Sequence, residues 1–390
     1  MIVSAEPKRS VKNWDPTSWT SKPALQQATY PDHVALQDAL SQLSSLPPLV
    51  TSWEILALKQ QIAEAQAGQR FFLQGGDCAE LFAECEPSIV ANRLKVLLQM
   101  SLILVHGLEM PVIRVGRFAG QYAKPRSEDT ETVDGVTLPS YRGDLINAAD
   151  FTPESRTPDP QRLLQAYSYA AISMNFVRGL VDGGFADLHH PEYWDLGWVE
   201  HSPLAEEFHK ISQSIGSSVR FVETISGRAP GSLRRVDFFT SHEALHLHYE
   251  QALTRDVPRQ WGHFNLSTHF PWIGLRTADV NGAHVELLRG IRNPIGIKVG
   301  PGMSVSDVKA LLERLNPENE AGRIVLIHRL GANAIDQDLP DLINAVKATS
   351  SPVLWICDPM HGNTEKTSNG FKTRDFTKIQ YEVERAIEIH

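Results

Sequence analysis

The sequence has 390 residues, 42% of them hydrophobic and 21% charged, which is the composition of a globular protein with enough apolar side chains for a large core. A formal net charge of −9 argues against nucleic acid or an anionic membrane as the main partner, and no run approaches the ~18 apolar residues of a membrane span. The three cysteines form no CxxC pair and the N-terminus has no secretory signal, so we expect a cytoplasmic protein.

The first part of the chain is rich in Pro, Ser and Trp up to about residue 50. Trp14, Trp19 and Trp53 indicate an ordered extension that packs on another part of the protein, because buried indole rings contribute strongly to packing. We therefore assign residues 1–65 to an N-terminal extension that packs on a main domain formed by residues 66–390.

From residue 68 onward, short β-rich runs alternate with amphipathic helical stretches such as residues 304–315 and 339–349. Most runs are continuously apolar and β-branched, as expected of strands buried on both faces. The seven runs are residues 71–74, 112–116, 236–240, 264–268, 295–300, 324–329 and 353–357. Their alternation with helices predicts the α/β class, either a (β/α)8 TIM barrel with one strand not seen or an open doubly wound sheet. No G-x-G-x-x-G motif follows the first run, which weakens a dinucleotide-binding fold.

The interval between the second and third predicted strands is far longer than one crossover connection needs. It contains two stretches with helical periodicity, residues 159–184 and 203–225. We interpret this interval as a helical insertion that covers about residues 155–230.

Polar side chains follow almost every predicted strand, and in a barrel these positions form the C-terminal mouth where active sites lie. The cations among them are Arg117, Lys124, Arg126, Arg276, Lys298 and Arg329. Together they imply a ligand set with several negative charges, such as two phosphates and a carboxylate, because guanidinium and ammonium groups bind these anions. The alternative is six independent surface cations.

Cys78 and His361 follow the first and seventh predicted strands, which flank the eighth strand of a closed barrel. A thiolate and an imidazole at adjoining strand ends are suitable ligands for a shared divalent metal ion. The alternatives are a small buried cysteine with a backbone-bonded loop histidine, or a Cys/His nucleophilic pair. We assign structural roles to Cys85 and Cys357. We assign HEALHLH (242–248) to a helix surface and core, because its histidines lack the H-E-x-x-H spacing.

Seven segments share a recognisable pattern that runs through most of the chain. They are FLQGGDCAE, PVIRVGRFAGQYAKPRS, YRGDLIN, SHEAL, WIGLRT, GIKVGP and DPMHGNTEKTSNGFKTR. In these segments the chain resembles the type II 3-deoxy-7-phosphoheptulonate (DAHP) synthases. The resemblance implies a (β/α)8 barrel enzyme that condenses phosphoenolpyruvate with erythrose 4-phosphate, giving DAHP and phosphate, in the first step of the shikimate pathway. It also implies a divalent metal, Mn2+ or Co2+, and mixed S/N/O ligation would admit Zn2+, Fe2+ or Cd2+ as well.

The resemblance also implies roles for individual residues. Cys78 and His361 match metal ligands. The positions that match phosphoenolpyruvate binding are Arg117, Leu275, Arg276, Lys298 and Arg329. The positions that match erythrose 4-phosphate binding are Lys124, Arg126 and Ser127, and Lys124 also matches a catalytic position near the reacting aldehyde oxygen. Leu275 replaces the glutamate of the family's W-I-G-E-R-T segment, which changes little if that position acts through its backbone N–H and alters substrate binding if the carboxylate acts.

Long members of this family continue past the position of His390 and supply an eighth strand, together with a Glu and an Asp that ligate the metal. We therefore expect the eighth strand and those two ligands to be missing from this chain, and the chain alone to be inactive. The resemblance further implies aromatic amino acid effectors bound at the helical insertion, and a homo-oligomer. Two alternatives are a non-catalytic aromatic-amino-acid-binding or regulatory protein on the same scaffold, and a condensation of phosphoenolpyruvate with another aldose phosphate.

Overall fold

The computed structural model describes residues 12–183, 201–226 and 237–390. Contacts between residues divide the chain into two compact units. Unit 1 consists of Met1–Ala28, Val50–Gln66 and Glu243–His390, and unit 2 consists of Thr29–Leu49 and Ala67–His242. Each unit is described by itself.

Unit 2 contains parallel strands in chain order, β1 (Phe71–Gly76), β2 (Val112–Arg117) and β5 (Phe239–Glu243). Strand β1 pairs with β2 from Phe71↔Val112 to Gly76↔Arg117, so both strands end at the same edge of the sheet. Helix α3 (Pro87–Leu108) joins them and packs against both strands. It begins with a proline in its first turn and ends at Glu109, whose φ of 52° closes the helix in the left-handed conformation.

Helix α3 is, within the described ranges, the one helix long and apolar enough to cross a membrane by length and composition. The sequence expectation counted uninterrupted apolar runs and therefore passed over it, because Arg93 and Lys95 interrupt its first half. Its buried face, with Leu94, Leu98 and Leu102, belongs to a hydrophobic cluster of unit 2. A core helix of an α/β protein meets the same length and composition test, so the finding alone does not indicate a membrane span.

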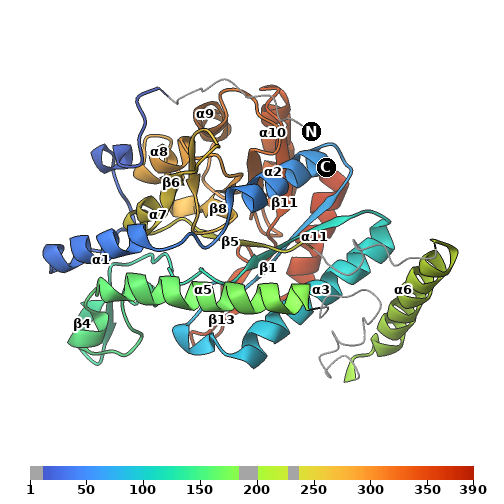
Figure 1. Ribbon diagram of the computed structural model, residues 1–390, viewed down its shortest axis with the longest axis horizontal. Helices are drawn as coiled ribbons and strands as arrows, with labels where there is room; N and C mark the ends of the chain where they lie inside the picture. The colour runs from blue at the N-terminus through green and yellow to red at the C-terminus, as the bar shows by residue number, and fades with distance from the viewer. Residues whose placement is uncertain (1–11, 184–200, 227–236) are drawn as a thin grey trace. The chain divides into compact units, whose positions relative to one another are not determined.

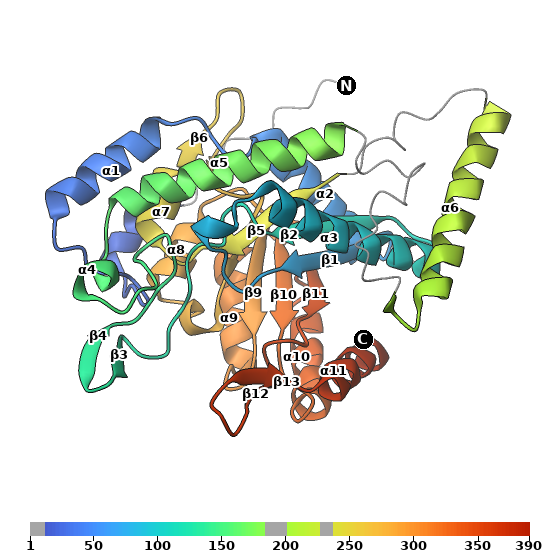
Figure 2. The same cartoon turned by 90° about the horizontal axis from the view of Figure 1, so that it is seen from below.

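The remaining elements of unit 2 are mostly helical and lie outside the three strands. A hairpin and several helices follow β2, and α1 (His33–Ser45) lies beside α5, as Figures 1 and 2 both show. These elements are η2 (Phe82–Glu84), β3 (Thr130–Val133), β4 (Val136–Pro139), α4 (Pro153–Arg156), α5 (Gln161–Asp182) and α6 (Ala205–Ser226). The proposed insertion, residues 155–230, contains α5 and α6, and its residues 184–200 and 227–230 lie outside the described ranges.

Unit 1 contains four parallel strands, again in chain order, and Figure 2 shows β9 to β11 side by side. They are β8 (Phe270–Ile273), β9 (Ile295–Val299), β10 (Ile324–His328) and β11 (Val353–Cys357). The helices between and after them are α8 (Ala283–Arg289), α9 (Val305–Leu315), α10 (Ile335–Lys347) and α11 (Phe376–Ile389). Their apolar faces bury Leu311, Leu342 and Ala386 against strand residues such as Ile297 and Leu326. Burial of these side chains supplies the main stabilisation of the unit.

Two tryptophan side chains, Trp14 and Trp19, attach the N-terminal residues of unit 1 to the rest of that unit. Trp14 Nε1 donates a hydrogen bond to the carbonyl of Glu286 (2.8 Å), and Trp19 Nε1 donates to Oε1 of Gln251 (2.8 Å). Trp53 differs, since 69% of its surface is exposed on α2. The smaller elements of the unit are η1 (Ser18–Ser21), α2 (Ser52–Gln66), α7 (Leu247–Ala252), β6 (Thr254–Asp256), β7 (His263–Asn265), η6 (Leu275–Thr277), β12 (Thr364–Lys366) and β13 (Lys372–Arg374).

Two local predictions were wrong. The fourth parallel strand is not residues 264–268, because β7 pairs with β6 in an antiparallel ribbon and the parallel strand is β8. Pro271 hides β8 in the sequence, since a proline cannot donate to a strand ladder. The segment 242–248 is not a helix surface, because its first two residues end β5 and His246 caps α7 by accepting a hydrogen bond from the Tyr249 N–H (3.3 Å).

In both units, parallel strands follow one another in chain order with helices between them. This is the pattern of a (β/α)8 barrel of the TIM type, and the α/β barrel class is confirmed. Seven strands of this kind occur among the described residues, and their C-terminal ends carry the polar side chains singled out in the sequence.

Candidate active site

The strongest electrostatic contact at the strand ends of unit 1 joins Lys298, Asp358 and His361. Lys298 is buried in β9 and forms an ion pair with Asp358, which directly follows β11. The ring Nδ1 of His361 contacts both carboxylate oxygens of Asp358, at 3.0 and 2.8 Å. Burial alone would raise the pKa of Asp358, but the hydrogen bond from His361 and the charge of Lys298 outweigh burial and hold that pKa well below its ordinary range.

This contact suits His361 to metal binding. A carboxylate bonded to Nδ1 fixes the ring orientation and the tautomer, and directs Nε2 as the ligand atom. The backbone N–H of His361 also points to Asp358 Oδ1 (3.4 Å), so the loop after β11 wraps around one carboxylate. On the chemistry of its donor, His361 therefore fits a divalent metal ion.

The arginines of unit 1 lie close to this loop. Arg329 follows β10, and its Nη2 donates to the carbonyl oxygen of His361 (2.8 Å). Burial lowers the pKa of Arg329, and the nearby charge of Arg276 lowers it further. A methyl group added at Gly300 would lie 3.1 Å from Leu275 Cδ2 and 3.3 Å from Arg329 Cγ, so these two side chains meet at that glycine. The structure thus brings three predicted residues of unit 1, Lys298, Arg329 and His361, together around Asp358.

In unit 2, Arg117 ends β2 and Cys78 lies in the exposed loop after β1. The Nη2 atom of Arg117 donates to the carbonyl oxygen of Cys78 (3.4 Å), so the structure brings these two predicted residues together. Cys78 is exposed, as a thiol that meets a ligand must be. Of the two proposed metal ligands, Cys78 belongs to unit 2 and His361 belongs to unit 1.

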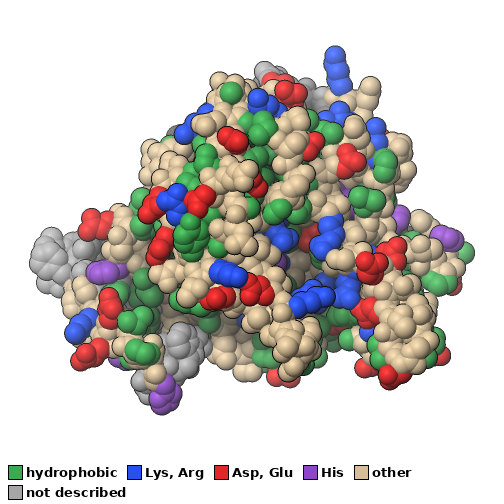
Figure 3. Space-filling model, turned by 180° about the vertical axis from the view of Figure 1, so that it is seen from behind, with side chains coloured by type: hydrophobic (Ala, Val, Ile, Leu, Met, Phe, Trp, Pro, Cys, Tyr) green, Lys and Arg blue, Asp and Glu red, His purple; other side chains and the backbone are tan. Residues whose placement is uncertain are grey.

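The KPRS segment of unit 2 is held mainly through its backbone and one ion pair. Lys124 donates its N–H to the carbonyl of Arg142 (2.8 Å) and leaves its side chain half-buried. Arg126 forms an ion pair with Glu131, and Ser127 is exposed. Basic side chains also lie beside acidic ones across the face in Figure 3, so a negative net charge is compatible with local cationic sites.

Three carboxylates near these residues were not singled out in the sequence. Asp358 contacts the His361 ring in the loop after β11, and two buried glutamates, Glu80 and Glu382, accept hydrogen bonds from loop N–H groups. Glu80 and Asp358 lie inside the motifs GGDCAE and DPMHGNT, so their position after a strand was an available signal. Glu382 lies on a terminal helix, and the sequence offers no comparable signal for it.

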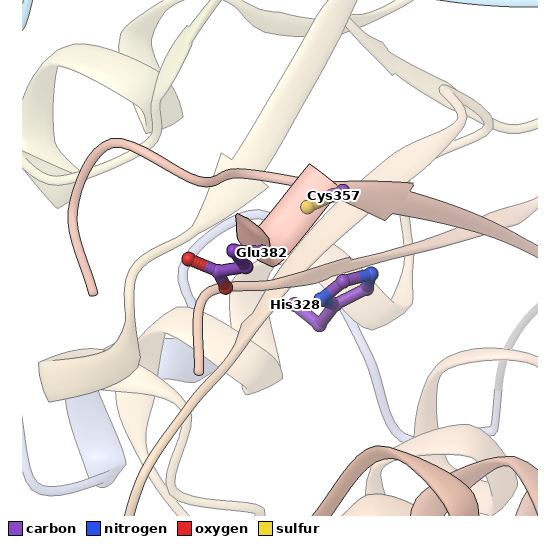
Figure 4. Close-up of side chains that lie close together, drawn as sticks. All are labelled: His328, Cys357 and Glu382. Carbon is purple, nitrogen blue, oxygen red and sulfur yellow. The ribbon is translucent and has the colours of Figure 1, made fainter. Parts of the chain in front are cut away.

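A second group of potential metal ligands occurs in unit 1. His328, Cys357 and Glu382 come from β10, β11 and α11, and their ligand atoms lie within 4.8 Å of one another (Figure 4). Burial lowers the pKa of His328 to about 3, and among the described residues neither of its ring nitrogens has a hydrogen-bond partner. Burial also raises the pKa of the Cys357 thiol, and both oxygens of Glu382 already accept hydrogen bonds. A metal ion at this group would have to deprotonate the thiol and compete with the hydrogen bonds that Glu382 already accepts.

The fold places the protein in the α/β-barrel class. The model of the Class-II DAHP synthetase family matches residues 14–390, and the chain belongs to that family, whose members are transferases. It is 43% identical over 404 aligned residues to the phospho-2-dehydro-3-deoxyheptonate aldolase of Neurospora crassa, covering all of this chain and 84% of that protein. It is 44% identical over 390 residues to the protein of that name from Streptomyces coelicolor, covering all of this chain and 86% of that protein. Membership of the family implies a divalent metal.

Proposed function

We propose that the protein condenses phosphoenolpyruvate with erythrose 4-phosphate and water to give DAHP and inorganic phosphate. The observation that carries the proposal is the Lys298–Asp358–His361 contact with Arg329 beside it. This contact supports the proposal because Lys298 and Arg329 are side chains suited to an anionic substrate and His361, oriented by a carboxylate, is suited to a metal.

Phosphoenolpyruvate carries a phosphate and a carboxylate, and five residues are proposed to bind it. Guanidinium groups bind each anion through two parallel hydrogen bonds, and a buried lysine adds a point charge in a low-dielectric setting. Leu275 can contribute only its backbone N–H, because its side chain is apolar. The five residues are Arg117, Leu275, Arg276, Lys298 and Arg329.

Erythrose 4-phosphate is proposed to bind the KPRS segment of unit 2. Arg126 and Ser127 would hold its phosphate, and the side chain of Lys124 would reach the aldehyde oxygen. Arg126 already has an acidic neighbour in Glu131, so a bound phosphate competes with that carboxylate for the guanidinium. This competition predicts that Glu131 tunes the affinity for the aldose phosphate.

Cys78 and His361 are the residues that would hold the metal, which we propose to be Mn2+ or Co2+, with Zn2+, Fe2+ or Cd2+ also suited to mixed S/N/O ligands. When bound, such an ion supplies Lewis-acid polarisation of a substrate carbonyl. Asp358 holds the His361 ring in place through Nδ1.

The remaining steps depend on this chain's cations. The methylene carbon of phosphoenolpyruvate bonds to the aldehyde carbon, and Lys124 Nζ gives a proton to the aldehyde oxygen as that oxygen gains charge. Water adds its oxygen to the former enol carbon, the bond from that carbon to the bridging oxygen breaks, and the phosphate leaves with that oxygen. One proton of the water returns to Lys124 and the other goes to the departing phosphate. The arginines and Lys298 offset the repulsion between two anionic substrates and hold them in a reactive orientation.

Three further properties are proposed on the family resemblance. The helical insertion would bind aromatic amino acid effectors, residues 1–65 would form an extension packing on the barrel, and the enzyme would be a cytoplasmic homo-oligomer. Rates measured with Trp, Phe and Tyr, singly and in pairs, would test the first. Light scattering would give the molar mass of the assembly, and a monomer would contradict the third.

The test of the main proposal uses the full-length gene product, stripped of metal and reloaded with each of the five ions. We expect DAHP and phosphate in equal amounts with at least Mn2+ or Co2+, and none after chelation. Ribose 5-phosphate in place of erythrose 4-phosphate should give little product. DAHP formation that is absent with every ion would overturn the proposal, and a preference for the five-carbon sugar would favour a related condensation.

A further inference from the structure

Glu382, on helix α11 of unit 1, connects the loop after β10 with the loop after β11. Its side chain is fully buried, with an exposed fraction of 0%. Oε1 accepts hydrogen bonds from the N–H groups of Leu330 (3.0 Å) and Gly331 (2.9 Å) in the loop after β10. Oε2 accepts a hydrogen bond from Nδ2 of Asn363 (2.7 Å) in the loop after β11. One carboxylate therefore holds both loops.

Asn363 completes the connection between the loops. Its Oδ1 accepts the N–H of Ala332 (2.9 Å), and its Nδ2 also donates to the carbonyl of Pro359 (2.8 Å). The N–H groups of three consecutive residues, 330 to 332, thus donate hydrogen bonds to the side chains of Glu382 and Asn363. We call these two side chains the Glu–Asn clamp.

The backbones of the two loops touch at a pair of glycines. Gly331 has a φ of +81°, and a methyl group added there would lie 2.8 Å from the carbonyl oxygen of Gly362. A methyl group at Gly362 would in turn overlap the backbone of Gly331. No other residue type fits at this contact, so the spacing of the loops is fixed by backbone contact on one side and by the clamp on the other.

The same two loops carry Arg329 and His361. Arg329 directly precedes the first clamped N–H, His361 lies two residues before Asn363, and Arg329 Nη2 donates to the His361 carbonyl (2.8 Å). A loop that carries a functional side chain must be supported by neighbours whose own positions are fixed. Glu382 is placed to give that support without touching a substrate.

The structure assigns Glu382 as a positioning residue that sets the distance between the phosphoenolpyruvate-binding Arg329 and the metal-binding His361. The assignment rests on the proposed function of those two residues. Metal binding by Glu382 itself is the weaker interpretation, because three hydrogen bonds already occupy its two oxygens.

The test compares Glu382→Gln with Glu384→Gln, an exposed glutamate on the same helix. The amide of Glu382→Gln brings a donor against either a backbone N–H or the Asn363 amide, so the clamp opens. We expect the KM for phosphoenolpyruvate to rise about tenfold while the KM for erythrose 4-phosphate stays within about twofold, and Glu384→Gln to leave both unchanged. Exchanging both partners, Glu382→Gln with Asn363→Asp, should recover part of the loss, because an amide donor then faces a carboxylate.

Hydrogen exchange gives a readout that does not need activity. In the unaltered protein the amides of residues 330–332 should be protected, and in Glu382→Gln they should exchange at least tenfold faster, while amides in β9 stay protected. If Glu382→Gln does not fold, Asn363→Ala removes half of the clamp and should show the same selectivity. Equal changes in both KM values, or unchanged exchange at residues 330–332, would overturn the assignment. If residues 330–332 exchange faster in Glu382→Gln but the unaltered protein forms no DAHP, the proposed function is overturned and the role of the Glu–Asn clamp in holding the loops remains.

Discussion

Each unit of the molecule joins a proposed phosphoenolpyruvate arginine to the backbone of a proposed metal ligand. In unit 2, Arg117 donates to the carbonyl of Cys78, and in unit 1, Arg329 donates to the carbonyl of His361. The bonds differ in length, 3.4 Å in unit 2 and 2.8 Å in unit 1, and in exposure, since Cys78 is exposed and His361 is half-buried. Two unrelated stretches of sequence thus form the same local contact, in which a proposed substrate-binding arginine donates to the backbone of a proposed metal ligand.

A buried glutamate supports each arrangement, but the two glutamates are compensated differently. Glu80 accepts the N–H groups of Ala119, Gly120 and Gln121 at 2.9, 2.9 and 2.8 Å, and the guanidinium of Arg93 lies 3.9 Å away. Glu382 accepts two N–H groups and an amide, and among the described residues no basic side chain lies within ion-pair distance of it. Burial raises the pKa of both carboxyl groups, and the N–H donors oppose that rise. A buried charge can therefore be held by oriented dipoles alone or by dipoles with a cation.

The largest effect should come from the two proposed metal ligands, one in each arrangement. Cys78→Ser and His361→Asn should each abolish metal-dependent DAHP formation while leaving the unfolding midpoint within a few degrees, because a metal site that loses one ligand is weakened or distorted. Metal content by elemental analysis, together with rate, checks this. Cys85→Ser is the control, since its thiol contacts Ser173 inside unit 2. Near-normal metal content and rate in Cys78→Ser would remove unit 2 from the metal site.

Substrate selectivity gives the next largest effect and tests whether the two arginines are equivalent. Arg117→Ala and Arg329→Ala should each raise the KM for phosphoenolpyruvate at least tenfold, since a charge-assisted contact typically contributes ~1.5–3 kcal/mol. Arg126→Ala should instead raise the KM for erythrose 4-phosphate. Arg385→Ala, an arginine on α11 that pairs with Asp336, is the matched control. If all of the active-site variants weaken both substrates equally, the assignment of these arginines to two different substrates is wrong.

How much of this the sequence could predict depends on the kind of contact. Continuous apolar runs located β1, β2, β9, β10 and β11 within a residue or two, because strands buried on both faces need such runs. Strand β8 was not predicted, because Pro271 interrupts its run of apolar residues typical of a strand. The strand-end cations could be listed from the sequence, but the pairing of Lys298 with Asp358 could not, since Lys298 lies 60 residues from that partner. Glu80 and Glu382 were invisible because their partners are mostly backbone N–H groups, which every residue except proline carries.

Glu80 and Glu382 should also differ in what they contribute to the free energy of unfolding, an effect smaller than the losses of activity above. Both oxygens of Glu80 face backbone donors, so Glu80→Gln must turn an NH2 group toward an N–H, and should lower the free energy of unfolding by about 2–4 kcal/mol. Glu382→Gln should cost less, because only Oε1 of Glu382 accepts backbone N–H groups, and its other oxygen faces the side chain of Asn363. Urea unfolding monitored by circular dichroism would measure both. Glu84→Gln, which removes a partly exposed partner of Arg93, should cost less than about 1 kcal/mol and serves as the control. A smaller cost for Glu80→Gln than for Glu84→Gln would show that the N–H contacts of Glu80 contribute little.

The smallest effect concerns acid stability, which should depend on buried histidines of unit 1. Burial lowers the pKa of His284 from its ordinary 6.5 to about 4, although its contact with the Leu245 carbonyl (3.0 Å) opposes the shift. Between pH 6.5 and 4 the unfolded chain therefore binds a proton at this position that the folded chain does not, so stability falls as the pH falls and is unaffected above pH 6.5.

His284→Gln keeps a donor for the Leu245 carbonyl and cannot titrate. Its loss of unfolding free energy between pH 7 and pH 5 should be smaller than that of the unaltered protein by about 1–2 kcal/mol. His33→Gln, at an exposed position of unit 2, serves as the control. Equal slopes for His284→Gln and the unaltered protein would mean that His284 titrates alike in both states, and that the acid sensitivity of unit 1 lies in other groups such as His246, whose pKa burial lowers to about 3.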